Sequence, residues 1–125
     1  MKRRYSLKRN KEFRYVYRVG KTQRSRSIVL IHADSQDERL LFGFCVSKKL
    51  GNAVTRNQVK RRMREAVRSV LSDIKQGSRI ILIARNPILD IGFDEIRADI
   101  CYVLRKARLF YDAERPCAKK ERHET

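Results

Sequence analysis

Residues 40–64 read LLFGFCVSKKLGNAVTRNQVKRRMR, and this stretch decides the fold because it changes from a strand pattern to a helix pattern. Residues 40–46 are apolar and include Phe42, Phe44 and Val46, which is typical of a strand. Gly51 and Asn52 then interrupt the chain. Thr55 is the expected N-cap of a long helix that runs from residue 56 to about residue 75, where Gly77 can stop it.

The predicted long helix is amphipathic. Its apolar side chains fall on one arc of a helical wheel and its polar side chains fall on the opposite arc, as expected for a helix packed on a core. The apolar arc holds Val59, Met63, Ala66, Val67, Val70 and Ile74. The polar arc holds Asn57, Lys60, Arg61, Arg64 and Arg68. The helix should therefore present a row of cations to solvent or to a partner.

Upstream of this stretch, the sequence predicts one helix and one strand. Residues 7–18 have apolar side chains at helical spacing, with Gly20 as a stop signal. Residues 27–33 (SIVLIHA) read as a strand, and the polar residues 34–39 are the expected turn of a hairpin that joins this strand to residues 40–46.

Downstream, residues 79–84 (RIILIA) are almost all apolar and predict an internal strand. Apolar spacing predicts a last helix from Phe93 to about Phe110. The pattern indicates a two-layer α/β sandwich with helices packed on a sheet. We expect one domain over residues 1–112 and a disordered tail over residues 113–125.

Charge is the main functional signal of the chain. The chain has 125 residues, with 31 Lys and Arg against 14 Asp and Glu, so its formal net charge is +17. Residues 1–33 hold eleven basic residues and one acid, Glu12, and residues 47–64 hold seven basic residues and no acid. Two acid-poor segments indicate a binding face, and a polyanion, above all a nucleic acid, is the expected partner.

The same sequence offers little for catalysis or membrane binding. His32 lies in a predicted strand and His123 in the predicted tail, and the carboxylates form no recognised metal-ligand pattern. We therefore expect no catalytic residue and no metal site in the protein. No apolar run approaches the roughly 20 residues of a membrane span, and no secretory signal is visible, so a cytoplasmic location is expected.

A nucleic-acid binder needs cations for phosphates and, for unpaired strands, flat groups for bases. The long helix and the preceding Lys48 and Lys49 supply the cations. Phe13 and Tyr17 are spaced i, i+4 on the first helix and could supply stacking surfaces. The same spacing is also typical of aromatic residues that anchor a helix to a sheet.

Residues 43–65 strongly resemble the signature of the bacterial ribonuclease P protein family, approximately G-x-x-V-S-K-K-x-G-x-A-V-x-R-N-x-x-K-R-x-x-R-E. Similarity extends to the first helix and to residues 80–87, and covers about residues 3–110. Two positions depart from the usual pattern. Tyr17 stands where the family commonly has Phe, and Cys45 replaces a small residue that is often Ser.

The resemblance implies an α+β fold like domain 2 of ribosomal protein S5, with a mixed four-stranded sheet, three helices and a left-handed β-α-β crossover. The fourth strand would lie in residues 21–26 or arise from a break in one of the longer strands. The implied function is that of the protein subunit of ribonuclease P, a ribonucleoprotein endonuclease that removes the 5′ leader of precursor tRNA. Its RNA subunit would be the catalyst and would bind the Mg²⁺.

The resemblance also implies the partners and the site. The partners would be ribonuclease P RNA, in a 1:1 complex, and precursor tRNA, with no membrane and no DNA. Phe13 and Tyr17 would contact the single-stranded leader. The residues expected to bind RNA are Lys48, Lys49, Arg56, Asn57, Lys60, Arg61, Arg64 and Arg68. For Arg68, the expectation depends mainly on its position on the helical wheel. The alternative is a structural RNA binder, similar to a ribosomal protein, with no part in cleavage.

Overall fold

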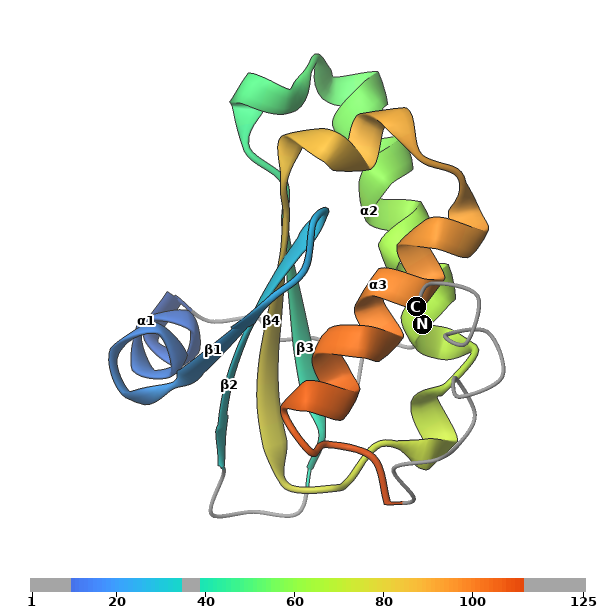
Figure 1. Ribbon diagram of the computed structural model, residues 1–125. Coiled ribbons are helices and arrows are strands. Elements are labelled where there is room, and N and C mark those ends of the chain that lie inside the picture. The colour runs from blue at the N-terminus through green and yellow to red at the C-terminus, as the bar shows by residue number, and fades with distance from the viewer. Residues whose placement is uncertain (1–9, 35–38, 112–125) are drawn as a thin grey trace.

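Four strands form one mixed sheet in the computed structural model, which describes residues 10–34 and 39–111 (Figure 1). The strands are β1 (Lys21–Arg24), β2 (Ile28–Asp34), β3 (Leu41–Cys45) and β4 (Ser78–Ala84). Their order across the sheet is β1-β2-β4-β3. β3 and β4 are parallel, whereas β1 with β2 and β2 with β4 are antiparallel. The fourth strand is thus β1, within residues 21–26, one of the two places in which the sequence allowed it.

The hairpin predicted between residues 27–33 and 40–46 is wrong. β4 lies between β2 and β3 and pairs with both of them. β4 occupies the central position because an internal strand must bury both faces, and the side chains of β4 are almost entirely buried. The prediction that residues 79–84 form an internal strand is confirmed. β3, α2 and β4 consequently form a β-α-β unit with parallel strands.

In the part of the chain that the structure describes, three α-helices cover the sheet, and together with it they give the predicted α+β sandwich. α2 (Ala53–Arg68) and α3 (Phe93–Lys106) pack on one face, and α1 (Asn10–Val19) lies on the opposite face (Figure 1). Every residue of the predicted apolar arc of the long helix is buried. The larger core, between the sheet and the α2–α3 pair, includes Phe42, Met63, Leu82 and Ile100.

The ends of α2 differ from the prediction. Asn52, not Thr55, is the N-cap, because the Asn52 side chain accepts a hydrogen bond from the Thr55 backbone N–H at 2.9 Å. Gly51, with φ 152°, turns the chain into this cap in a conformation that favours glycine. The helix ends at Arg68, short of residue 75. Ile74 is nevertheless buried, because its side chain packs in the main core where the chain forms an isolated β-bridge with Phe110.

The same bridge explains why α3 ends at Lys106 rather than near Phe110. Arg108 has a positive φ of 60° and ends the helical direction of the chain. The following segment turns back, and the Lys75 backbone N–H donates to the Leu109 carbonyl at 2.7 Å. The predicted helix start at residue 7 and the predicted tail over residues 113–125 lie outside the described residues.

α1 is held on its face of the sheet by a small apolar cluster. Val16 is fully buried against Ala33, Leu41 and Ile81. Gly20 allows this close approach: a Cβ there would lie 2.4 Å from the Val16 carbonyl oxygen and 2.9 Å from that of His32. The predicted stop signal at Gly20 is therefore also a packing requirement.

Candidate nucleic-acid interface

The cationic face of the molecule is built at the end of β3. The chain leaves the sheet at Cys45, forms the 3₁₀-helix η2 (Lys48–Leu50), and enters α2 at Ala53. The Ser47 hydroxyl accepts a hydrogen bond from the Lys49 backbone N–H at 3.1 Å, which fixes the turn that carries both lysines. Lys48 and Lys49 are exposed, and the buried Leu50 anchors the segment to the core.

The burial of one side of α2 determines where its cations point. Val59, Met63, Ala66 and Val67 pack inward, so the opposite side of the helix faces outward. We define the cationic face as η2, the outward side of α2 and the two half-buried cations that flank that side, Arg56 and Lys60. Defined in this way, it holds every residue predicted to bind RNA. Asn57, Arg61, Arg64 and Arg68 are exposed on it, and Arg56 and Lys60 are half-buried.

The N-terminal end of α2 adds to the positive potential. Unpaired backbone N–H groups and the helix dipole favour anions at this end. The first turn contains no acidic residue. Arg56 lies in that turn and Asn57 directly follows it, and Lys48 and Lys49 lie in the segment just before the helix. This end of the cationic face therefore suits the phosphates of a nucleic acid.

Two arginines of α2 are held by neighbouring side chains. The Arg64 guanidinium lies over the Phe44 ring, 5.7 Å from its centroid, and Phe44 is in turn stacked on Phe42. Arg68 forms an ion pair with Glu65 at 2.7 Å, and this contact lowers the pKa of the Glu65 carboxyl. Arg64 is thus oriented without losing its charge, whereas the charge of Arg68 is already balanced.

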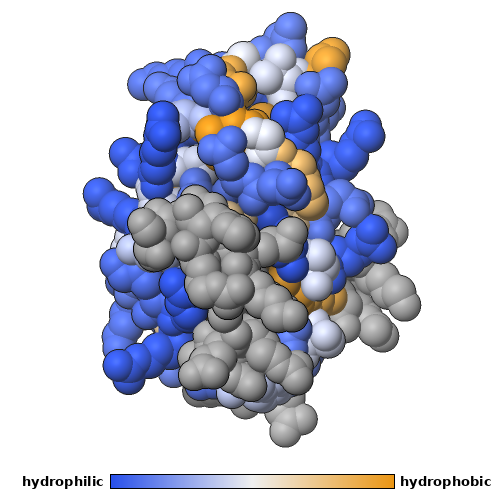
Figure 2. Space-filling model, turned by 45° about the vertical axis from the view of Figure 1, so that its right-hand side comes forward, coloured by the Kyte–Doolittle hydropathy of each residue, from blue (hydrophilic) through white to orange (hydrophobic). Residues whose placement is uncertain are grey.

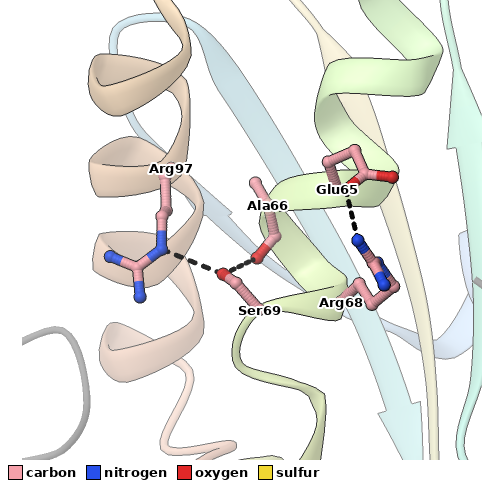
Figure 3. A network of polar contacts seen from close by, with 5 residues as sticks. All are labelled: Glu65, Ala66, Arg68, Ser69 and Arg97. Atoms are coloured by element: carbon pink, nitrogen blue, oxygen red, sulfur yellow. Dashed lines mark hydrogen bonds and ion pairs between the residues drawn. The ribbon is translucent and has the colours of Figure 1, made fainter.

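The far end of α2 is tied to α3 by a polar chain (Figure 3). Arg97 of α3 donates from Nε to the Ser69 hydroxyl at 2.9 Å, and that hydroxyl donates to the Ala66 carbonyl at 2.7 Å. These contacts and the shared core fix the orientation of α2.

On the side of the molecule turned forward in Figure 2, the surface is mostly hydrophilic and broken by small hydrophobic areas.

The predicted leader-binding residues lie on the opposite face of the sheet, on α1. Phe13 is half-buried and packs against the cluster around Val16, so it has the anchoring contact that the spacing also allowed. Tyr17 is 47% exposed, and its hydroxyl lies 3.7 Å from the Cys45 Sγ. Burial of the hydroxyl, with a smaller contribution from Cys45, raises the pKa of Tyr17 to about 12. Tyr17 is therefore a neutral phenol at physiological pH.

The two groups of predicted residues meet only near the end of β3. Cys45, which contacts Tyr17, lies three residues before Lys48 of η2. Helix α2 itself is separated from α1 by the sheet (Figure 1). One polyanion lying on the cationic face would not also cover the Tyr17 side of the sheet. The arrangement fits two nucleic-acid segments, one on each side.

Two residues near these surfaces were missed from the sequence. Phe44, which supports Arg64, was interpreted only as part of a strand, and alternation in β3 could have placed it on the α2 side. Arg85 lies in residues 80–87, which the sequence links to function only through the resemblance. Its Nη1 donates to the Ser25 carbonyl at 3.0 Å, so it lies beside the β1–β2 turn. Finding Arg85 required the β2–β4 pairing, which the sequence did not predict.

Within residues 10–34 and 39–111, no three His, Cys, Asp or Glu side chains gather in a way that could hold a metal ion. His32 is half-buried on β2, and burial lowers its pKa below the ordinary value. Across that same described part of the chain, no helix is both long and apolar enough to span a membrane.

Comparison with known proteins gives consistent matches over most of the chain. The family model described as Ribonuclease P matches residues 1–108. The ribonuclease P protein component of Geobacillus thermodenitrificans is 37% identical over 108 residues, which cover 86% of this chain and 89% of that protein. The similar component of Streptococcus pneumoniae is 33% identical over 110 residues, covering 88% of this chain and 89% of that one.

Solved structures agree with these relatives. The RNase P protein of Staphylococcus aureus superposes with a TM-score of 0.79 at 36% identity, covering 85% of this chain and 97% of that one. The RNase P protein of Thermotoga maritima has a TM-score of 0.75 at 24% identity, covering 81% of this chain and 96% of that one, and supports the fold.

Proposed function

The chain belongs to the ribonuclease P protein family, and from this premise we propose how its two surfaces serve the ribonucleoprotein that trims precursor tRNA. The protein is the RNA-binding component of that endonuclease, and the activity is that of the holoenzyme. The cationic face binds ribonuclease P RNA, in a 1:1 complex. The sheet face beside α1 binds the 5′ leader of the precursor. Family membership leaves no support for the alternative of a ribosomal-type structural RNA binder.

The orientation of α2 is the observation that carries this proposal. Its apolar side is fully used by the core, so its cations are free to meet phosphates without any change of fold. The proposed RNA-binding set is Lys48 and Lys49 of η2, together with Arg56, Asn57, Lys60, Arg61 and Arg64 of α2, and with Arg68 beside Glu65. Cations on adjoining turns can follow a phosphate backbone, and each neutralised phosphate releases counterions.

Tyr17 supports the second part of the proposal. Its ring is nearly half exposed and its position is restrained by the contact with Cys45. A base stacked on an aromatic ring contributes roughly 1–3 kcal/mol, which corresponds to about 5- to 150-fold in affinity. Because only the precursor has a leader, such a contact favours substrate over mature product. Phe13, which is half-buried beside the same cluster, completes this surface.

Catalysis is assigned to the RNA subunit, which would bind the Mg²⁺ ions that activate the attacking water. The protein would hold the leader in place and screen the repulsion between the two RNAs. Its own residues would supply no metal ligand, no general base and no nucleophile. We place the complex in the cytoplasm, where precursor tRNA would be the substrate.

Charge reversal tests the assignment of the cationic face. Arg61→Glu with Arg64→Glu should weaken binding of ribonuclease P RNA at least tenfold in a filter-binding assay, because two phosphate contacts become repulsive. Lys75→Glu with Lys106→Glu is the matched control, since it changes the net charge equally at exposed positions outside this face. Equal losses in the two double variants would show that only the overall charge matters and would refute the assignment.

A further inference from the structure

One part of the sheet face beside α1 is not covered by that helix. Val16 closes the region over Ala33, Leu41 and Ile81. Toward the other end of the strands, Cys45, Ile83 and Val29 are only half-buried. Strand pairing puts these three in one row, because Cys45 is the register partner of Ile83, and Ile83 is the partner of Val29.

The row ends at a cation on the edge strand. Val29 pairs with Arg24 of β1, which is exposed. Cys45 and Ile83 belong to the cluster on the α1 side of the sheet, and residues directly opposite each other in a sheet share a face. Arg24 therefore lies on the α1 side at one end of the row. Tyr17 lies at the other end, in contact with Cys45.

The dimensions of the row suit a short stretch of single-stranded RNA. Three steps between neighbouring strands, at about 4.8 Å each, make the row about 14 Å long. Its middle is apolar and only half-buried, which suits the flat faces of bases. One end carries an aromatic ring and the other a guanidinium, which suits a phosphate.

With the leader on the sheet face beside α1, we propose that Arg24 binds a leader phosphate distal to the cleavage site, at the edge-strand end of this row. This inference rests on the proposed function and adds to it a direction for the strand and a further contact. Tyr17 contacts Cys45 at the end of β3, where the chain passes into the cationic face that binds the catalytic RNA. The base next to Tyr17 would therefore be proximal to the cleavage site, and the backbone beyond Val29 would reach Arg24 at the sheet edge. Binding would then depend on whether the leader is long enough to reach β1.

The edge strand provides its own matched control. Lys21 is exposed on the same strand, but it pairs with His32 and lies on the opposite face of the sheet. Lys21→Gln and Arg24→Gln make the same change in net charge, three residues apart. The experiment measures the affinity of the reconstituted holoenzyme for a precursor with a long leader and for one whose leader is cut to a single nucleotide. Both are titrated across a range of salt concentrations.

Arg24→Gln should weaken binding of the long-leader precursor about three- to tenfold. It should also make the plot of log K against log salt less steep by about 0.7, which is the value for one phosphate of a single strand. The same variant should bind the single-nucleotide precursor like the wild type. Lys21→Gln should bind both precursors like the wild type.

Two results would overturn the inference. One is equal loss in the Arg24 and Lys21 variants, and the other is an Arg24 loss that does not depend on leader length. Failure of the proposed function has a different signature, because the wild-type holoenzyme would then show no preference for leader-bearing precursor over mature tRNA. Unfolding curves for both variants should match that of the wild type, because both side chains are exposed.

Discussion

The ion pair between Arg68 and Glu65 makes a sharp prediction about which cations of α2 contribute to RNA binding. The two side chains are 2.7 Å apart and together carry no net charge. Within residues 10–34 and 39–111, no ion pair forms at the other cations predicted to bind RNA, which are Lys48, Lys49, Arg56, Lys60, Arg61 and Arg64. Six contacts at about 0.7–0.9 per phosphate give a salt slope of about −4 to −5.

Three variants separate the contributions. Arg61→Gln removes one contact, so the plot of log K against log salt should become less steep by about 0.7–0.9. The double change Glu65→Gln with Arg68→Gln removes a neutral pair and should leave the slope unchanged. Glu65→Gln alone frees the charge of Arg68 and should make the slope steeper by about one contact. An exposed ion pair of this kind contributes little to stability, so folding should not be affected.

The assay is filter binding of ribonuclease P RNA to each variant over a range of salt concentrations, with unfolding curves as the control for folding. The reasoning would be refuted if the Glu65/Arg68 double variant lost as much slope as Arg61→Gln. Arg68 would then contact a phosphate despite its partner, as the helical wheel alone predicts.

Three further perturbations test other parts of the structure. Val16→Ala should lower the free energy of unfolding by about 2 kcal/mol, because it removes two buried carbon atoms and leaves a cavity under α1. Urea denaturation measures this loss. An unchanged free energy of unfolding would mean that Val16 does not anchor α1. His32 has a lowered pKa, so it contributes stability that is present above its unfolded pKa and is lost as the pH falls through the folded value. Urea midpoints should therefore fall from pH 7 toward pH 5 in the wild type and fall less in His32→Gln. Phe44→Leu removes the ring beneath Arg64, a contact worth about 0.5–1 kcal/mol, and should weaken RNA binding about two- to fivefold; the same loss persisting in an Arg64→Gln background would contradict this role.

Much of the site could be predicted from the sequence because it lies on one helix. An amphipathic helix fixes which residues face outward, and the buried positions of Val59, Met63, Ala66 and Val67 confirm the wheel. The end of that helix was misplaced because Val70 and Ile74 continue the apolar period after the helix has stopped. Their burial comes from packing and from the bridge to Phe110, which periodicity does not distinguish from helix.

Pairing between distant segments could not be predicted. Residues 34–39 have the polar composition of a hairpin turn, yet β4 inserts between β2 and β3 because the central position needs the most apolar strand. The weak strand β1 has little apolar pattern of its own, and pairing with β2 defines it. The positions of Arg24 and Arg85 beside the site follow from this pairing and were therefore not visible in the sequence.

The most direct test of the account is cleavage of a leader-bearing precursor tRNA by three preparations at low Mg²⁺: ribonuclease P RNA alone, this protein alone, and the two combined. The account predicts weak cleavage by the RNA, none by the protein freed of nucleic acid, and strong, correctly placed cleavage by the mixture. Cleavage by the protein alone, or a mixture no faster than the RNA, would contradict it.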